Sequence, residues 1–464
     1  MNTRSHLSEL QKVFKEKEHI FLEEYFTFLR FKSISADPLF RNELLQCASW
    51  LKEKISSIGF TVDMWETEGN PILYAEYSKA GPDKPTILFY NHYDVQPVDP
   101  IDLWDTPPFE PTLKNNQIFA RGAQDNKGQC MYVYQAFKTL LELTGELPVN
   151  IKWIIEGEEE VGSKNIAAIL DSKKKFLQVD YLVIADMGIP AKDTPAVTLG
   201  VRGLVTMDVE ATGSLTDLHS GTHGGRAFNP IHALTEILSK LRDSEGRITV
   251  PGFYDKVREL SAKDREEISF YFDADFYKET FGLIASGGEK SYTPLERSTI
   301  RPTLEINGIS GGYSGVGFKT VIPAKAHAKI SCRLVPDQDP DEIAKAVSHY
   351  ITSLAPEGIK IAVNVHSGKG KAVRADSDSA IVKAFFQAYT DVFGKKCLYS
   401  FEGGSIPVAS ALKNACNAEI ILVGLGLDSD NIHAPNEHFG WDRFEQGFRL
   451  IIEMLLNFRE KLIR

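Results

Sequence analysis

Short, almost continuously apolar runs alternate with longer amphipathic stretches over the first 200 residues of the chain. Continuous apolar runs are typical of strands buried in a parallel sheet, and apolar residues at helical spacing are typical of the helices that cover it. The pattern predicts strands over 61–65, 72–77, 85–91, 149–155 and 181–185, and helices over 8–31, 42–58, 130–143 and 166–170.

A different order of elements follows residue 203. The sequence predicts strand, helix, strand, strand, helix and strand over 204–211, 230–241, 303–309, 326–334, 340–354 and 360–365. This is the order of a ferredoxin-like unit. The stretch 245–300 follows neither period, and we expect it to be irregular with some helix.

The first pattern resumes near the C-terminus, with a helix expected over 377–393, a strand over 419–424 and a helix over 441–459. A length of 464 residues also favours two domains over one core. We therefore predict an α/β fold. A mixed, mostly parallel sheet flanked by helices is expected from 1–202 and 372–464, interrupted by an inserted α+β ferredoxin-like domain over 203–371.

The composition indicates which classes of partner are disfavoured and which compartment is expected. The net charge of −11 disfavours nucleic acid or an anionic membrane as the main partner. The sequence has neither a run as long as a membrane span nor the apolar core of a signal peptide. The five cysteines are scattered and form no C-x-x-C pair, which is typical of reduced thiols in a cytoplasmic protein.

The strand predicted over 85–91 ends in two side chains that are suited to metal chemistry, His92 and Asp94. Residues two apart lie on the same face of a strand. The imidazole can bind a metal, and the carboxylate can bind the other ring nitrogen or orient its neighbours. Taken alone, His-x-Asp is more typical of a polar loop.

Three further acidic segments occupy comparable places. Asp125 precedes the helix at 130–143, the glutamates at 158–160 follow the strand at 149–155, and Asp186 follows the strand at 181–185. A helix cap and a solvated acidic turn are the simpler interpretations of the first two. In open α/β sheets, however, ligand sites gather beyond the carboxyl ends of parallel strands. If the strands share one sheet, these acidic groups converge with His92.

His433 follows the predicted strand 419–424 and offers a second ring nitrogen. Histidines and carboxylates without thiolates suit zinc, manganese or cobalt. Two such ions, about 3.5–4 Å apart and bridged by one carboxylate, activate a water between them. The adjacent Glu159 and Glu160 could then divide the work, one binding metal and the other moving the proton.

With these motifs in order, the chain resembles the dinuclear-zinc exopeptidase family over essentially its whole length. Its branch of cytosolic non-specific dipeptidases and carnosinases is the most similar. The segments that carry this closer resemblance are Asp217-Leu-His-Ser-Gly221, Val250-Pro-Gly-Phe-Tyr-Asp255, Thr320-Val-Ile-Pro323, Arg333-Leu-Val-Pro336 and Gly403-Gly-Ser-Ile-Pro407. The resemblance implies a metal-dependent hydrolase that cleaves the amide bond next to the C-terminal amino acid of dipeptides or small peptides.

The resemblance also implies the metal ligands. His92 and Asp186 would bind one ion, Glu160 and His433 would bind the other, and Asp125 would bridge the two. The ions would most often be zinc, with manganese or cobalt as alternatives.

Further roles follow from the same family pattern. Asp94 would hold His92, Glu159 would be the general base, and the bond from Asp125 to Asn126 would be a cis peptide. Glu158 stands where relatives often have an apolar residue, so a register shifted by one remains an alternative.

The inserted domain would supply a homodimer interface and some of the substrate contacts. His219 would reach into the partner's active site and stabilise the oxyanion together with Thr320. Arg333, Gly404 and Ser405 would bind the terminal carboxylate of the substrate.

One departure bears on specificity. Relatives often carry Arg where this chain has Phe401, and Arg374 is an alternative source of that charge. Two other functions stay open at this point. One is an N-acyl amino acid deacylase or desuccinylase with the same site, and the other is a catalytically inactive binding protein on this fold.

Overall fold

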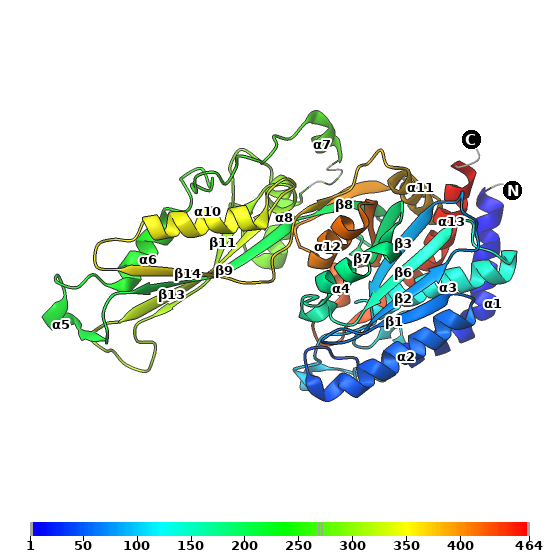
Figure 1. Ribbon diagram of the computed structural model, residues 1–464, viewed down its shortest axis with the longest axis horizontal. Coiled ribbons are helices and arrows are strands. Elements are labelled where there is room, and N and C mark those ends of the chain that lie inside the picture. Colours follow the sequence, from blue (N-terminus) through cyan, green and yellow to red (C-terminus); the bar gives the residue numbers. More distant parts are fainter. Residues whose placement is uncertain (1–2, 268–269, 271, 462–464) are drawn as a thin grey trace. The chain divides into compact units, whose positions relative to one another are not determined.

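The computed structural model describes residues 3–267, 270 and 272–461 (Figure 1). The chain forms two compact units. The first comprises Met1–Leu199, Ala375–Ser400 and Ala411–Arg464, and the second comprises Gly200–Arg374 and Phe401–Ser410. The predicted domain limits were 202/203 and 371/372, and the sequence did not single out Phe401–Ser410 as part of the second unit.

A mixed sheet forms the centre of the first unit, in the order β1-β2-β6-β3-β7-β17-β8. The neighbours β6, β3, β7 and β17 run parallel to one another, whereas β1, β2 and β8 pair antiparallel with theirs. The strands are β1 (Thr61–Trp65), β2 (Ile72–Tyr77), β3 (Thr86–His92), β6 (Asn150–Glu156), β7 (Tyr181–Gly188), β8 (Ala196–Val201) and β17 (Glu419–Gly426). The predicted mixed, mostly parallel sheet is confirmed.

Four helices of the first unit pack against one another beside this sheet (Figure 1). They are α1 (Thr3–Arg30), α3 (Lys127–Thr144), α11 (Ala380–Phe393) and α13 (Trp441–Lys461). Aromatic rings fill the seam between α1 and α13, where the centroid of Phe14 lies 5.4 Å from that of Phe448 and Tyr25 stacks on Phe444. Such rings bury a large apolar area, so this seam anchors the N-terminal helix to the C-terminal one.

The remaining helices of the first unit are α2 (Arg41–Ser57) and α4 (Ile166–Ser172), and α12 (Pro407–Cys416) begins within the second unit. A separate small sheet joins β4 (Thr112–Lys114), β5 (Gln117–Phe119) and β18 (His438–Gly440). It places the residues before α3 next to those that precede α13.

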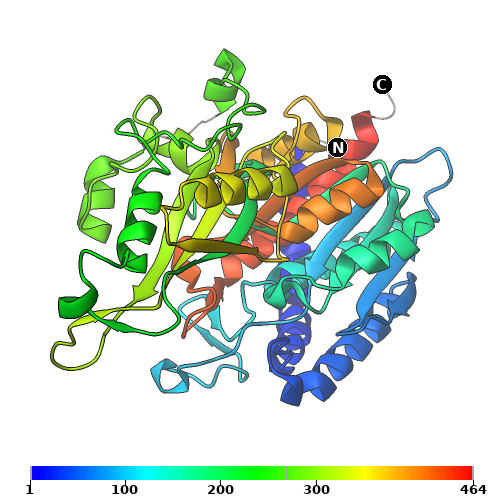
Figure 2. The same ribbon diagram turned by 60° about the vertical axis from the view of Figure 1, so that its left-hand side comes forward.

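The second unit contains the predicted ferredoxin-like arrangement. Its sheet has the order β11-β13-β9-β14 with antiparallel neighbours, and α6 and α10 pack on it (Figure 2). The elements are β9 (Gly203–Thr212), α6 (Pro230–Ser239), β11 (Thr303–Gly311), β13 (Lys325–Leu334), α10 (Pro340–Ser353) and β14 (Lys360–Val365). Burial alternates along β9, so one face of the sheet carries the core.

The stretch 245–300, which was expected to be irregular with some helix, contains the short helices α7 (Ala262–Glu267), α8 (Ala274–Phe281) and α9 (Pro294–Thr299) among its described residues. Other elements escaped the sequence-based prediction. The fully buried β8 was not predicted at all. A two-stranded sheet of β10 (Leu218–His219) and β12 (Val321–Ile322) was also missed. Within the described part of the chain, no helix combines the length and the apolar character needed to cross a membrane.

Candidate metal centre and substrate residues

The end of β3 brings His92 into a group of three side chains with Asp125 and Asp186. The imidazole of His92 is fully buried, and its Nε2 lies 3.0 Å from Oδ1 of Asp125 and 3.7 Å from Oδ2 of Asp186. One ligand atom from each of the three residues lies within 4.8 Å of the other two. This spacing allows all three to bind one metal ion.

A second group of three shares Asp125 with the first. Nε2 of His433 lies 3.0 Å from Oδ2 of Asp125 and 3.1 Å from Oε2 of Glu160. The two oxygens of Asp125 thus face different histidines, with Oδ1 towards His92 and Oδ2 towards His433. A carboxylate in this position can bridge two metal ions.

Strand ends supply most of the centre, as the sequence suggested, but not all of it. The parallel strands β3 and β7 carry His92 and Asp186, and the turn after their neighbour β6 carries Glu160. All three residues lie at one edge of the sheet. Asp125 does not follow a strand of this sheet. The strand before it, β5, belongs to the small sheet with β4 and β18, and Asp125 reaches the centre from the turn that leads into α3.

The Asp125–Asn126 peptide bond is cis, as the family resemblance implied. The side chain of Asn126 is buried, and its amide donates to Oδ1 of Asp186 at 2.6 Å and to the carbonyl of Ala185 at 2.9 Å. Its carbonyl oxygen accepts from Asn91 at 2.7 Å. Asn126 therefore orients Asp186, a contact that sequence reasoning missed because nothing in the sequence shows which strand end faces the turn.

Asp94 connects the end of β3 with the turn that follows β6. Its carboxylate accepts the backbone N–H of Glu159 at 3.2 Å and that of Glu160 at 3.1 Å. The Nδ1 atom of His92 lies 3.4 Å from the Asp94 carboxylate and 3.1 Å from the Asp94 carbonyl oxygen. Gln96, which the sequence did not single out, donates to the Glu160 carboxylate at 2.9 Å.

The three neighbouring glutamates differ in their surroundings. Glu160 faces His433, whereas Glu158 accepts a hydrogen bond from Asn165 at 2.8 Å. Glu159 belongs to neither group of ligands. Burial raises the pKa of Glu159 to about 7, and the negative charges of Asp125 and Glu160 add to the effect. This geometry favours Glu160 as the ligand and leaves Glu159 available for proton transfer, and it gives no support to the register shifted by one.

The buried carboxylates of this centre favour a bound cation. Burial raises the pKa of Asp186 well above its usual range, although the charge of His92 opposes the shift and the other carboxylates add to it. Hydrogen bonds to Asp125 and Glu160 raise the pKa of His433 to about 10. Carboxylates held this close repel one another unless positive charge lies between them. Two imidazoles and three carboxylates are a donor set that fits divalent zinc, manganese or cobalt.

The predicted substrate residues lie in the second unit and form two pairs. Oγ1 of Thr320 lies 3.4 Å from Nε2 of His219, where β10 pairs with β12. The guanidinium of Arg333 donates to Oγ of Ser405 at 2.8 Å. Gly404 lies next to Ser405, and its carbonyl accepts the backbone N–H of Arg202 at 2.9 Å.

Arg374, the alternative source of charge near Phe401, is committed to other contacts. Its guanidinium pairs with the carboxylates of Asp264 and Glu267 and lies 5.1 Å from the ring centroid of Phe401. These two acids already balance its charge, so the structure gives no support to a role for Arg374 in binding an anionic substrate.

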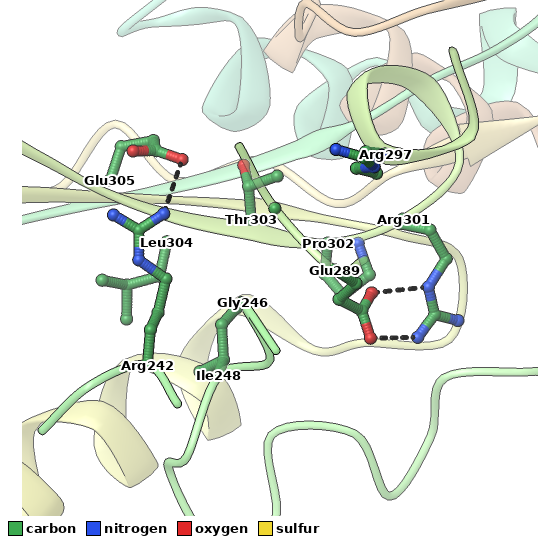
Figure 3. Close-up of a pocket in the computed structure, with 11 residues that line it drawn as sticks. Arg242, Gly246, Ile248, Glu289, Arg297, Arg301, Pro302, Thr303, Leu304 and Glu305 are labelled. Carbon is green, nitrogen blue, oxygen red and sulfur yellow. Dashed lines mark hydrogen bonds and ion pairs between the residues drawn. The ribbon is translucent and has the colours of Figure 1, made fainter. Parts of the chain in front are cut away.

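A small cavity in the second unit lies among Arg242, Arg301, Glu289 and Glu305 (Figure 3). The guanidinium of Arg301 donates to both oxygens of Glu289, at 2.8 and 3.0 Å. The volume, about 10 Å³, is enough for about one water molecule. This cavity is too small for a dipeptide.

Residues 88–457 match the model of peptidase family M20/M25/M40. The Cys-Gly metallodipeptidase of Schizosaccharomyces pombe is 31% identical over 96% of this chain and 96% of its own length. The chain belongs to peptidase family M20/M25/M40. The predicted family and enzyme class, a metal-dependent peptidase, are confirmed.

Two further relatives agree with this family assignment. The Beta-Ala-His dipeptidase of Homo sapiens is 32% identical over 91% of this chain and 87% of its own length. The crystal structure of an M20 family metallo-carboxypeptidase from Sulfolobus solfataricus superimposes with a TM-score of 0.83 at 33% identity. It covers 95% of this chain and 99% of the other. The predicted fold, a catalytic α/β part with an inserted α+β part, is therefore confirmed for this M20 peptidase.

Proposed function

We propose that this M20 peptidase is a dipeptidase that hydrolyses the amide bond next to the C-terminal amino acid, with two divalent metal ions. The observation that carries the proposal is the carboxylate of Asp125, whose two oxygens face the two separate groups of ligands. The names of the relatives, a Cys-Gly metallodipeptidase and a Beta-Ala-His dipeptidase, support dipeptides as the substrate class.

In this proposal His92 and Asp186 would hold one ion, Glu160 and His433 would hold the other, and Asp125 would contribute to both. Zinc is the preferred metal because the donors are imidazole and carboxylate groups. When bound, the two ions supply a water nucleophile that is active near neutral pH and polarise the scissile carbonyl.

The protein's own groups then move the proton. Glu159 accepts a proton from the attacking water and returns it to the leaving amine, which requires a pKa close to the working pH. Burial raises the pKa of Glu159 in the metal-free site, which is the direction that this role requires. Asp94 contacts both the backbone N–H of Glu159 and the ring of His92, so it holds the base and a metal ligand in fixed positions relative to each other.

The substrate's terminal carboxylate is assigned to Arg333, Ser405 and Gly404. Burial lowers the pKa of Arg333, and none of the described residues forms an ion pair with it. A half-buried guanidinium without a carboxylate partner is suited to binding an anionic group of the substrate through paired hydrogen bonds. His219 and Thr320, the other pair, are assigned to the carbonyl oxygen of the scissile bond.

We also infer a homodimer formed through the second unit, in which His219 serves the partner's site. Strand β11 lies at the edge of its sheet, and most of its side chains are exposed, Ile309 among them. An exposed edge strand is a template for pairing with another chain. The proposed compartment is the cytoplasm, because all five cysteines are buried and free.

A substrate panel on metal-free and zinc-reconstituted protein tests the proposal. Cys-Gly and β-Ala-His represent dipeptides, and N-acetyl and N-succinyl amino acids represent the deacylase alternative. We expect hydrolysis of dipeptides only after zinc is restored. Turnover of the acylated amino acids alone would instead favour a deacylase, and no turnover of any substrate by protein containing two zinc equivalents would favour a binding protein.

A further inference from the structure

The carboxylate of Glu437 is buried at the turn that presents Asp125. Its Oε1 accepts the backbone N–H of Gln124 at 3.0 Å and that of Asp125 at 3.1 Å. Its Oε2 accepts the backbone N–H of Gly122 and the guanidinium N–H of Arg121, both at 2.9 Å. Only 1% of Glu437 is exposed. Four donors within five consecutive residues thus converge on one side chain.

An ionised carboxylate, which has acceptor sites on both oxygens and no donor, suits these four N–H groups. Consecutive backbone N–H groups in a tight turn form a concave site for an anion. The turn depends on glycine at one position, because Gly122 has φ of +81°, and a Cβ there would lie 2.7 Å from the side chain of Val95. Glu437 therefore supplies, from within the protein, the anion that these N–H groups bind.

Glu437 also reaches the second group of ligands through its own chain. It follows His433 by four residues, and its backbone carbonyl accepts the N–H of Ala120 at 3.1 Å. The segment that carries His433 is thereby joined to the turn that carries Asp125, and their side chains lie 3.0 Å apart. A displacement of Glu437 would move a ligand of each proposed ion.

A buried carboxylate can instead serve stability alone, and the second unit provides an example. Glu289 is 5% exposed and holds the guanidinium of Arg301 through two hydrogen bonds. Both glutamates bind a buried arginine, but only Glu437 also binds the backbone of a proposed ligand. Glu289 is therefore the matched control for the general cost of losing a buried acid.

We propose that Glu437 is a positioning residue of the metal centre, which holds the bridging carboxylate of Asp125 in place between His92 and His433. The inference rests on the proposed two-metal function and extends it. Outer partners that orient metal ligands are generally worth about 10- to 100-fold in metal affinity. Replacing Glu437 by Gln turns one acceptor into a donor that faces N–H groups, so we expect a loss in that range for zinc.

Zinc titration of the metal-free protein, in competition with a chromogenic chelator, measures this loss. Glu437→Gln should bind zinc about 10- to 100-fold more weakly than the wild type, while Glu289→Gln should stay within about twofold. Wild-type zinc affinity in a folded Glu437→Gln protein would overturn the inference. If that variant does not fold, Glu437→Asp, which keeps the charge but shortens the reach, replaces it. An affinity equal to the wild type would again count against the proposal.

Hydrogen exchange in the metal-free proteins separates this inference from the proposed function. The amides of Gly122, Gln124 and Asp125 should exchange faster in Glu437→Gln than in the wild type and in Glu289→Gln. Unchanged exchange at these amides would overturn the positioning role, whatever the zinc affinity. Failure of the wild type to bind zinc would refute the two-metal function and with it the metal part of this inference, while faster exchange would still establish that Glu437 holds the turn.

Discussion

The carboxylate of Asp94 accepts the backbone N–H of Glu159 at 3.2 Å. The same carboxylate lies 3.4 Å from Nδ1 of His92. Asp94 therefore connects the proposed general base with a proposed ligand through one fully buried side chain. The His-x-Asp motif at the end of β3 therefore connects the ends of the neighbouring strands β3 and β6.

Replacing Asp94 by Asn should slow turnover without preventing folding. One oxygen would become an amide that faces an N–H donor, so the turn at Glu159 would lose an acceptor and His92 would lose a charged partner. We expect kcat to fall about 10- to 100-fold. Glu158→Gln is the matched control, because Glu158 contacts Asn165 and not the ligands. Steady-state kinetics with metal analysis measure both, and a wild-type kcat in Asp94→Asn would contradict the assigned role.

Glu156 should make the metal-free protein less stable as the pH rises. Burial raises the pKa of Glu156 to about 8, with the charge of Asp94 adding to the effect, whereas the usual value is 4.5. The folded state therefore keeps a proton that the unfolded state loses between about pH 4.5 and 8. The stability from this group is complete below that window and is lost through it.

Glu156→Gln should remove this pH dependence. Gln can still accept the hydrogen bond that the Tyr90 hydroxyl donates to Glu156 at 2.8 Å. We expect the variant and the wild type to have similar free energies of unfolding near pH 5, and the variant to be more stable by about 3–4 kcal/mol near pH 8.5. Urea unfolding at the two pH values measures this, and parallel pH profiles would show that Glu156 does not titrate as described.

Zinc binding should release protons from the ligands. The pKa of His433 is raised to about 10 by its hydrogen bonds to Asp125 and Glu160, so its ring is protonated near pH 7.5 in the metal-free protein and must become neutral to bind a metal. The pKa values of His92 and Asp186 are also raised above their usual ranges, which favours further bound protons in the metal-free centre. We expect release of at least about one proton per chain. Calorimetry in buffers of different ionisation enthalpy counts them, and zinc binding without proton release would refute this charge state.

Arg333→Ala should raise KM for dipeptides far more than it lowers kcat. If the guanidinium binds the substrate's carboxylate equally in the ground and transition states, its loss removes uniform binding. A charge-assisted contact of this kind is worth about 1.5–3 kcal/mol, which corresponds to roughly a 10- to 150-fold rise in KM. Arg374→Ala is the control in the same unit, because the acids Asp264 and Glu267 already pair with Arg374. A fall in kcat at unchanged KM for Arg333→Ala would contradict the assignment.

The sequence predicted the parts of the centre that depend on strand order. His92 and Asp186 follow apolar runs, and parallel strands bring such positions to one edge of a sheet. The ferredoxin-like order of the second unit was visible for the same reason, because helices and strands of distinct period alternate there.

Contacts that join distant turns could not be predicted in this way. Asn126 orients Asp186, and Glu437 lies more than 300 residues from the turn that it holds. The periodicity of apolar residues along the chain gives no information about such contacts. Strand β8 was missed because its short run resembles the loop around it, although the fold buries every residue of it.

The most direct test of the account is the kcat of Glu159→Gln on Cys-Gly, measured on protein that contains two zinc equivalents. Gln keeps the size of the side chain but cannot accept a proton from water. The account predicts a fall in kcat of about 10²–10⁴-fold, with zinc content equal to that of the wild type. A fully zinc-loaded Glu159→Gln enzyme that turns over at the wild-type rate would contradict it.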